Sequence, residues 1–196
     1  MSGTETTVVS LELRNAALSA IRRGWPVVPG TFLGADRRWH GRADAAGLCP
    51  ISEAWQDTPA TTPEHAEEIW SQHPYAVLLV CGQGVDVLEL PNRMMGLLSI
   101  FTGEGPVVPV AVTGSVPRFL VFTSTDVDFL LPEMTPVGVR LHGAGSWIAL
   151  PPTPTELVLA QRWWTTPLPG QPLLPPQVVC DALRSAGAGW SGDEQE

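Results

Sequence analysis

Residues Tyr75 to Pro91 read YAVLLVCGQGVDVLELP, and this stretch decides the fold. The run from Tyr75 to Cys81 is almost continuously apolar, which is typical of a strand buried on both faces. Gly82-Gln83-Gly84 then predicts a turn, and Val85 to Leu90 alternates in the manner of a strand. We therefore expect a hairpin in which the second strand is the antiparallel partner of the first.

The residues before this stretch predict two helices and a short strand. Leu11 to Arg23 carries apolar residues on one face at helical spacing, and Trp25 to Pro29 reads as a short strand. Gly30 to Pro50 is polar, glycine-containing and rich in arginine, so it predicts a loop. Thr62-Pro63-Glu64 combines an N-cap residue, a proline and an acid, and it begins a second helix that runs to about Gln72.

The residues after this stretch predict further strands joined by short connections. Met94 to Thr102 is predicted as a helix, and Asp126 to Leu131 as a short helix or a turn. The predicted strands are Val107 to Val112, Arg118 to Thr123, Gly138 to Leu141 and Trp147 to Leu150. Strands with hairpins and flanking helices indicate an α+β fold with a mainly antiparallel or mixed sheet, rather than a doubly wound fold.

The C-terminal part differs in composition, because proline is frequent from Pro151 to Pro176. Such a stretch favours extended structure, and we expect a strap that packs over the domain or extends from it. Trp163 and Trp164 either pin this strap to the domain or form an exposed anchor for a partner, and pinning is the favoured interpretation. We assign residues 1–155 to one domain, and residues 156–196 to the strap, a short last helix and an acidic tail.

Composition places the chain among compact proteins of a reducing compartment. The chain has 196 residues, 44% of them hydrophobic, which is enough for one sizeable core. Its three cysteines lie far apart and form no CxxC pair, and no basic, apolar leader opens the sequence. The longest apolar run is far shorter than the roughly 20 residues that a membrane-spanning helix needs. These features predict a cytoplasmic protein without a membrane partner.

Charge limits the possible partners. The formal net charge of −9 argues against bulk binding to nucleic acid, because phosphate contacts need a basic face. All 11 basic residues are arginines, so any phosphate must be bound by arginine, by backbone N–H groups or by helix N-termini. One loop is both basic and aromatic, since it contains Arg37, Arg38, Trp39, His40 and Arg42. Such a loop could stack a base and hold a phosphate backbone. An ordinary solvated loop fits the same residues, and the net acidity favours that interpretation.

Three segments follow one another along the chain: RRGWPVVPG (22–30), EAWQDTPATTPEHAEEIWSQHPYAVLLVCGQGVDVLELP (53–91) and VGVRLHGAGSWIALPPTPT (137–155). Taken together, with the opening helix before them, they resemble the N-terminal domain of bifunctional primase-polymerases, in the archaeo-eukaryotic primase superfamily. The first resembles that domain's first strand, the second its catalytic-strand block, and the third its arginine-bearing strand with a glycine-rich turn. The resemblance covers roughly residues 11 to 155 and implies the fold of that family.

The family's chemistry is two-metal nucleotidyl transfer, in which carboxylates hold two divalent ions. Its catalytic strand ends in Asp-x-Asp, and the matching residues here are Glu89, Leu90 and Pro91. Phe119 stands where the family has a nucleotide-binding histidine, and Gly138 is the best match for the third acid. One carboxylate is too few for a two-metal site, because each ion needs several oxygen ligands. The resemblance therefore implies a degenerate member, in which Glu89 is a relic and no catalytic residue is expected.

The strand around Glu89 is open to more than one interpretation. Its alternation with Leu88 and Leu90 favours a carboxylate that simply faces solvent at a strand end. Asp86 lies three residues earlier and points to the opposite face of a regular strand. A metal pair of Asp86 and Glu89 would therefore need a bulge, and we predict no metal site.

Arg118, Arg140 and His142 form the candidate ligand pocket. In the expected fold their strands are neighbours across the open face of the sheet, and two arginines with a histidine could clamp a phosphate or a carboxylate. Alternatively, these residues form surface pairs with acids, for which the candidates are Glu104, Asp126 and Asp128.

The sequence thus predicts a primase-polymerase-like domain that acts as a binding or regulatory module without a cofactor. Its partner would be a protein, or a nucleotide-like anion held in the relic cleft. One alternative is a divergent but active nucleotidyltransferase that uses Glu89 together with Mg²⁺ or Mn²⁺. Another is a protein-interaction domain without any small ligand. Thermal stabilisation by nucleotides, with and without metal, separates these possibilities.

Overall fold

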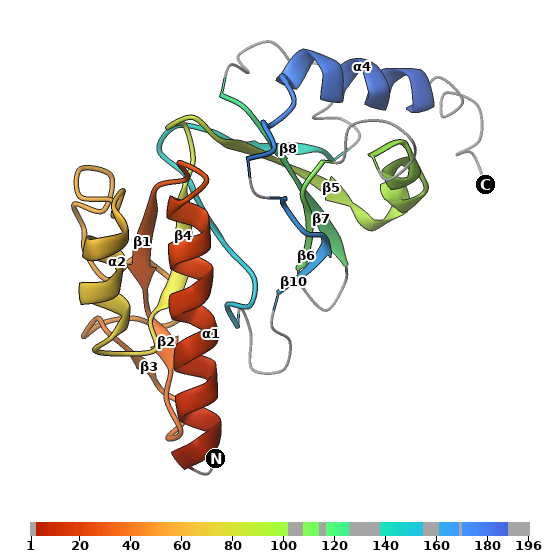
Figure 1. Ribbon diagram of the computed structural model, residues 1–196. Helices are drawn as coiled ribbons and strands as arrows, with labels where there is room; N and C mark the ends of the chain where they lie inside the picture. Colours follow the sequence, from red (N-terminus) through yellow and green to blue (C-terminus); the bar gives the residue numbers. More distant parts are fainter. Residues whose placement is uncertain are drawn as a thin grey trace.

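The computed structural model describes residues 3–101, 108–113, 117–125, 138–154, 161–168 and 170–187. Within these ranges the strands form three sheets, with the orders β1-β4-β9, β10-β6-β7-β5-β8 and β2-β3. Every strand pair in them is antiparallel. Figure 1 shows α1 and α2 beside the three-stranded sheet and α4 beyond the five-stranded sheet. This arrangement confirms the predicted α+β fold.

The three-stranded sheet is built from β1 (Val27–Gly30), β4 (Ala76–Val80) and β9 (Trp147–Ala149), with β4 in the centre. All five residues of β4 are buried, as the apolar run predicted. The helices α1 (Gly3–Ile21) and α2 (Pro63–Trp70) contact each other, and α1 also contacts β1 and β4. One face of the sheet is thus covered by helices.

Helix α2 begins where the sequence predicted. The hydroxyl of Thr62 accepts a hydrogen bond from the backbone N–H of His65 at 3.3 Å, and Pro63 occupies the first turn, where a free N–H is not needed. At the other end, Trp70 is completely buried and its indole N–H donates to the carbonyl of Tyr75 at 3.0 Å. The helix is therefore capped at its N-terminus and fixed at its C-terminus to the chain that enters β4.

The five-stranded sheet carries the functional residues discussed below. Its strands, in spatial order, are β10 (Arg162–Thr165), β6 (Val110–Thr113), β7 (Arg118–Thr123), β5 (Asp86–Pro91) and β8 (Arg140–His142). The 3₁₀ helix η1 (Asn92–Phe101) and α4 (Pro176–Gly187) contact each other, and η1 also contacts β5 and β7.

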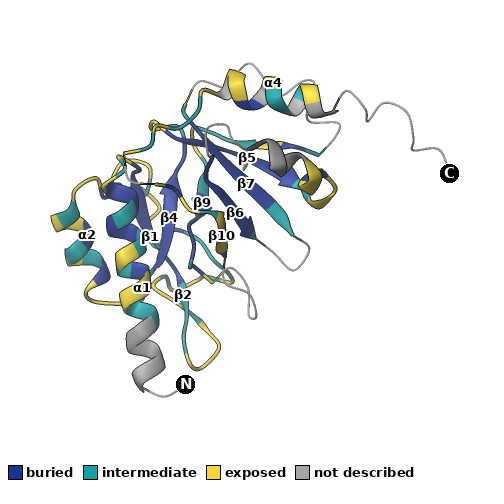
Figure 2. Ribbon diagram, turned by 45° about the vertical axis from the view of Figure 1, so that its right-hand side comes forward, coloured by how far each residue is buried: buried dark blue, intermediate teal, exposed yellow. Residues whose placement is uncertain are grey.

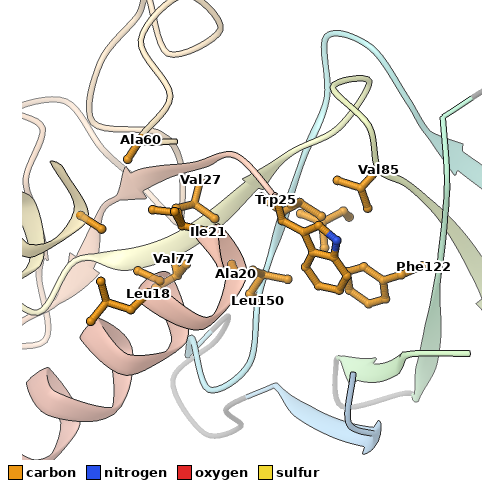
Figure 3. Packing of buried hydrophobic residues seen from close by; sticks show 14 of the residues in the cluster. Leu18, Ala20, Ile21, Trp25, Val27, Ala60, Val77, Val85, Phe122 and Leu150 are labelled. Carbon is orange, nitrogen blue, oxygen red and sulfur yellow. The ribbon is translucent and has the colours of Figure 1, made fainter. Parts of the chain in front are cut away.

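The main core lies between the two larger sheets. Trp25, which precedes β1, stacks on Phe122 of β7 with ring centroids 5.2 Å apart and planes 2° from parallel (Figure 3). Trp163 of β10 packs on the same phenylalanine at 5.3 Å. The three rings join the sheets, and Trp163 packs β10 against the rest of the core, while the predicted strap as a whole stays a prediction. Figure 2 shows how the buried residues concentrate in the strands.

A second core covers the opposite face of the five-stranded sheet. Leu88 and Leu90 of β5, Phe119 of β7 and Val179 of α4 belong to it, and each is at most 1% exposed. Alternation along β5 therefore divides its residues sharply, because Leu88 and Leu90 point to this core while Glu89 points to the cleft between the sheets.

The predicted hairpin of β4 and β5 is wrong. The two strands follow each other in sequence but lie in different sheets, since β4 pairs with β1 and β9, whereas β5 pairs with β7 and β8. Gly82, with a φ of 85°, redirects the chain between them, and a Cβ there would come within 2.4 Å of the Cα of Ala144. Only glycine fits this close approach, so the residues that suggested a hairpin turn instead make a crossing between sheets.

Two segments predicted as irregular contain strands. The loop from Gly30 to Pro50 includes β2 (Phe32–Leu33) and β3 (Trp39–His40), which pair as a short hairpin. The proline-rich segment includes β10, which adds to the edge of β6. All three strands are short, and hydrogen bonding and packing determine their pairing, without a visible period in the sequence.

Other boundaries shift by smaller amounts. Helix α1 starts at Gly3, well before the predicted Leu11, and the predicted helix around Met94 is a 3₁₀ helix that begins at Asn92. The predicted turn from Asp126 to Leu131 and the tail 188–196 lie outside the described residues. The division of the chain at residue 155 stays a prediction. In the part that the structure describes, no helix combines the length and apolarity needed to cross a membrane.

Candidate functional site

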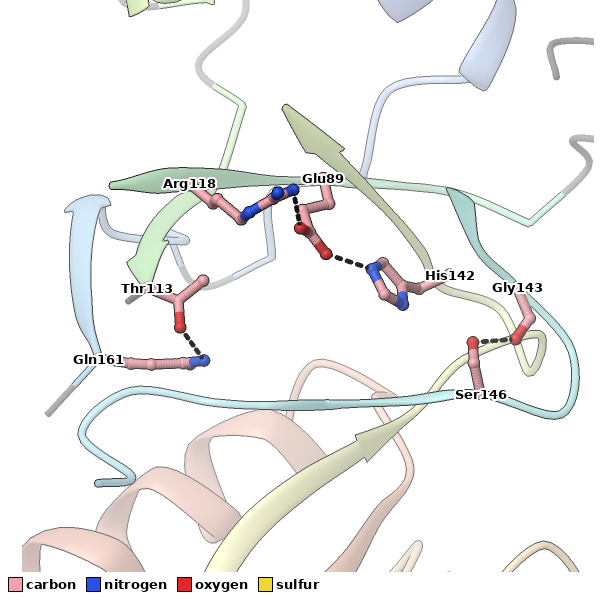
Figure 4. A network of polar contacts seen from close by, with 7 residues as sticks. All are labelled: Glu89, Thr113, Arg118, His142, Gly143, Ser146 and Gln161. Atoms are coloured by element: carbon pink, nitrogen blue, oxygen red, sulfur yellow. Dashed lines mark hydrogen bonds and ion pairs between the residues drawn. The ribbon is translucent and has the colours of Figure 1, made fainter. Parts of the chain in front are cut away.

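Glu89 lies at the centre of the candidate site, on the face of β5 that looks toward the cleft between the sheets. Its carboxylate Oε1 is 2.5 Å from Nη1 of Arg118 on β7, and its Oε2 is 2.8 Å from Nε2 of His142 on β8 (Figure 4). The glutamate side chain is only 12% exposed. The interpretation of Glu89 as a solvent-facing residue is therefore wrong, because each carboxylate oxygen has a partner on a neighbouring strand.

The register of the sheet explains this arrangement. His142 lies opposite Val87, and Arg118 lies opposite Pro91. Residues two apart on a strand share a face, so both side chains point to the same side as Glu89 and flank it along the strand. The pairing requires no bulge in β5.

Electrostatics favours an ionised Glu89. The hydrogen bond from His142 is the largest influence that lowers the pKa of this carboxyl below its usual range, and the contact with Arg118 acts in the same direction. Burial opposes them by disfavouring the charged form, but the net effect is a lowered pKa. Glu89 is thus a buried anion that is neutralised by its own neighbours.

Arg140 occupies a different position from its two companions. It is the Cα partner of Glu89 on β8, yet its side chain is exposed. Within the described part of the chain its guanidinium has neither a hydrogen bond nor an ion pair. The structure thus gathers Arg118, Arg140 and His142 around Glu89, but Arg140 alone of the three keeps its charge unpaired among these residues. The proposed acidic partners Glu104, Asp126 and Asp128 lie outside the described residues.

A cavity of about 360 Å³ adjoins this cluster, and we call it the Glu89 cleft. Its polar lining comes from Glu89, Thr113 and Gln161, and its apolar walls include Leu120 and Trp147. The amide of Gln161 donates to the Thr113 hydroxyl at 3.1 Å, which joins β6 to the residue before β10 (Figure 4). Sequence reasoning missed Thr113, Gln161 and Trp147, because none of them belongs to a recognisable motif.

The residues that align with the functional residues of the family do not come together around Glu89. Pro91 shares the face of Glu89 by alternation, whereas Gly138 precedes β8 with a φ of 77°, and neither offers an oxygen ligand from its side chain. Phe119, however, lies opposite Leu90 and points to the second core. The residue of β7 that stands opposite Glu89 is Leu120. Phe119 therefore does not occupy the site, and an apolar leucine stands beside the relic carboxylate instead.

Asp86 has a structural role on the other face of β5. Its Oδ1 accepts a hydrogen bond from the backbone N–H of Gly82 at 2.8 Å, which closes the crossing between the sheets. Burial raises the pKa of this carboxyl, and burial likewise raises the pKa of the neighbouring Cys81 thiol to about 12. Asp86 and Glu89 thus belong to separate environments. In the ranges that are described, no group of three or more His, Cys, Asp or Glu side chains could hold a metal ion.

Fold and site together define an α+β domain with a cleft between two antiparallel sheets. The family model described as bifunctional DNA primase/polymerase, N-terminal, matches residues 17–177. The chain therefore belongs to this family, as the resemblance predicted. No curated protein matches the sequence.

Proposed function

We propose that this chain is a catalytically degenerate member of the primase-polymerase family that binds an anionic ligand rather than polymerising nucleotides. The observation that supports the proposal most directly is the pairing of Glu89 with Arg118 and His142. Each oxygen of the Glu89 carboxylate faces a nitrogen donor. In a carboxylate that holds a divalent metal, an oxygen would face the metal ion instead. A divalent ion would therefore have to displace both partners.

The charges around the cleft favour an anion over a cation. Within the described ranges Glu89 is the one carboxylate that lines the cleft, and Arg118 and Arg140, which are not part of the lining, lie on the same face of the sheet as Glu89. A two-metal centre needs several carboxylate oxygens, one of which bridges the ions. Arginines on the two strands that flank β5 instead suit a phosphate or a carboxylate, which they can bind through paired N–H groups.

Arg140 is the residue most available to such a ligand, because its exposed guanidinium has no partner in the described part of the chain. The ion pair with Glu89 holds Arg118 in place, and the remaining N–H groups of Arg118 lie next to this pair. The ligand class that fits is a nucleotide-like anion, with its charged end at Arg140 and its apolar part toward Trp147 and Leu120 in the Glu89 cleft.

A thermal-shift screen with dNTPs, NTPs and inorganic pyrophosphate, each with and without Mn²⁺, tests this proposal. We expect stabilisation that does not require metal and that disappears in Arg140→Ala. Arg162→Ala is the matched control, because it removes an exposed arginine from the opposite edge of the same sheet.

Stabilisation that depends strictly on Mn²⁺ and on Glu89 would contradict the proposal and support an active nucleotidyltransferase. A flat screen would contradict anion binding in the cleft. The binding function would then have to reside in protein contacts of the proline- and tryptophan-rich segment.

A further inference from the structure

Strand β10 lies at one edge of the five-stranded sheet (Figure 1). A cavity of about 480 Å³ lies between this strand and helix α1, and we call it the α1–β10 groove. We propose that this groove binds an extended peptide of a partner protein, which adds to the free edge of β10 and places an acidic side chain at Arg23. The proposal goes beyond the function of the Glu89 cleft, because it concerns another cavity and another class of ligand.

The groove follows the edge of β10 rather than one face of the strand. Its described lining includes the consecutive residues Gln161, Arg162 and Trp163, and it includes no residue of β6. Since successive side chains of a strand point to opposite faces, a cavity that reaches all three adjoins the backbone between them. The other edge of β10 is occupied by β6, so the groove runs along the free edge.

The backbone of this edge offers hydrogen-bonding groups to a further strand. The N–H of Gln161 donates to the carbonyl of Thr153 at 3.1 Å and therefore points away from β6. Backbone groups two residues apart on a strand point the same way, so the N–H and C=O of Trp163 also face away from β6. No described strand pairs with β10 on that side. Pro151 and Pro152, which line the groove there, have no N–H to donate.

The length and the walls of the groove suit an extended chain. Its lining along α1 runs from Glu12 to Arg23, and eleven residues at 1.5 Å each span about 16 Å. Extended chain rises roughly 3.3 Å per residue, so this length accommodates about five residues. Trp25, Leu150 and Trp163 provide apolar walls. In strand addition the main chain gives affinity, and such walls receive alternate side chains of the peptide.

Arg23 supplies a positive charge that no carboxylate in the described part of the chain neutralises. Its Nη1 donates to the carbonyl of Ser19 at 2.6 Å and also to the Ser19 hydroxyl, and its Nη2 donates to the carbonyl of Pro167 at 2.7 Å. Its Nε is buried without a partner. Burial lowers the pKa of this guanidinium, because the charge is partly desolvated. An acidic group in the ligand would compensate that charge.

Two further side chains of the lining favour a peptide with an acidic residue. Gln161 is 5% exposed, and its Oε1 is buried without a hydrogen-bond partner, which suits a peptide N–H donor. Arg162 is exposed and has no ion pair among the described residues, so it adds a second positive charge. Glu12 is the one acid of the described lining, and it lies at the far end from Arg23. The acidic residue of the peptide therefore belongs at the Arg23 end.

The direction of the peptide follows from that of β10. Strand β10 runs from Arg162 toward Pro167, whose carbonyl contacts Arg23. Antiparallel pairing is the more stable arrangement per residue, and every described strand pair of this protein is antiparallel. A peptide that pairs antiparallel with β10 begins at the Arg23 end. Its acidic residue therefore precedes the residues that form the added strand.

Fluorescence anisotropy with the peptide Asp-Val-Thr-Val-Thr, acetylated and labelled at its C-terminal end, tests the proposal on the full chain. Two derivatives carry backbone N-methyl groups, one on both valines and the other on both threonines. Alternate N–H groups of a strand point to opposite sides, so only one derivative loses its hydrogen bonds to β10. We expect that derivative to bind at least roughly tenfold more weakly, and the other to stay within about twofold of the parent peptide. The reversed peptide, with its aspartate last, should bind at least roughly fivefold more weakly.

Substitutions in the protein locate the peptide. Arg23→Gln should weaken binding at least roughly fivefold, whereas Arg22→Gln, an exposed neighbour outside the described lining, should leave the Kd unchanged. Arg23 also holds the carbonyl of Pro167, so thermal unfolding shows whether the first variant is folded. Arg162→Gln changes an exposed side chain without a described contact and leaves the fold intact. It should weaken binding about threefold, because it removes the second charge.

Four results would each overturn the proposal. The first is an anisotropy that stays unchanged up to about 0.5 mM protein. The second is equal binding of the two N-methylated peptides, and the third is equal weakening by Arg22→Gln and Arg23→Gln. The fourth is competition by N-acetylaspartate amide as effective as that by the unlabelled pentapeptide, which would mean an anion site without strand addition. Sedimentation of the protein alone should give a monomer, and a dimer that the peptide dissociates would assign the free edge to a second copy instead.

Discussion

Glu89 stands on a central strand, and its partners come from positions 29 and 53 residues away in sequence. Pairing at such separations leaves no local pattern, which explains why the alternation of leucines around Glu89 suggested a solvent-facing carboxylate. The sequence placed Arg118, Arg140 and His142 on neighbouring strands, whereas in the structure β5 lies between β7 and β8. It could not reveal that Arg118 and His142 both pair with the glutamate, because that depends on the strand order.

Replacement of Glu89 by glutamine tests the strength of this cluster. The change should lower the free energy of unfolding by about 1 to 3 kcal/mol at pH 7, because the half-buried Arg118 loses the charge that compensates its desolvation and His142 loses a charged hydrogen-bond acceptor. Urea denaturation measures the difference. Glu53→Gln is the matched control, since it breaks an exposed pair with Arg42, and it should change stability by less than about 0.5 kcal/mol.

The same residue predicts a dependence of stability on pH. The pKa of Glu89 is lowered in the folded protein, so its contribution is complete above the usual glutamate pKa of about 4.3 and is lost as the pH falls through the lower folded value. The stability difference between wild type and Glu89→Gln should therefore shrink steadily from pH 5 to pH 2.5. A difference that stays constant over this range would contradict the ionised, paired state of Glu89.

Cys81 offers a chemical test of the crossing between the sheets. Burial raises the pKa of its thiol to about 12, and the residue is 1% exposed. Because the thiolate is the reactive form, we expect Cys81 to resist iodoacetamide at pH 8 in the native protein and to react fully in urea. Peptide mass spectrometry gives the extent of modification, and Cys49, which is only partly buried, is the internal reference. Equal modification of both cysteines in the native state would contradict the buried position.

At the scale of secondary-structure elements, the sequence predicted the periodicity and burial of helices and strands better than it predicted which strands pair. The apolar run of β4 correctly indicated burial on both faces, and the Thr62 cap correctly placed the start of α2. The predicted pairing of β5 with β4 was wrong, because a glycine turn between two strands fits a hairpin and a crossing between sheets equally well. A shift of one residue also reverses the face of a strand, and for this reason Phe119 was assigned to a site from which it points away.

Strand β10 allows a test of how the C-terminal segment is attached. Trp163→Ala should cost about 3 kcal/mol of stability, because it removes a ring that packs on Trp25 and Phe122 between the sheets. Trp164→Ala, one residue away, should cost about 1 kcal/mol or less, because that side chain is 51% exposed and contacts mainly the edge of Phe119. Thermal unfolding of the two variants side by side decides the point. Equal losses would mean that the segment is not pinned through Trp163.

For the whole molecule, family membership and chemistry have to be considered separately. The fold and the match over residues 17–177 establish a primase-polymerase domain, yet a fold hosts a reaction only through the residues of its site. Here the face of the sheet that lines the cleft presents one carboxylate between an arginine and a histidine, with Pro91 and Leu120 beside it. Our proposal that the site binds an anion rather than two metal ions rests on this face, where Glu89 is the one carboxylate among the described residues and is already paired.

Binding of Mn²⁺ to the wild-type protein, followed by the electron paramagnetic resonance signal of the free ion, tests this conclusion most directly. The titration is run with a dNTP at a concentration too low to retain the metal by itself, and with Glu89→Gln in parallel. We expect no stoichiometric site in either protein and identical curves for the two. Two equivalents of tightly bound Mn²⁺ in the wild type, lost in Glu89→Gln, would contradict the proposal and restore an active nucleotidyltransferase.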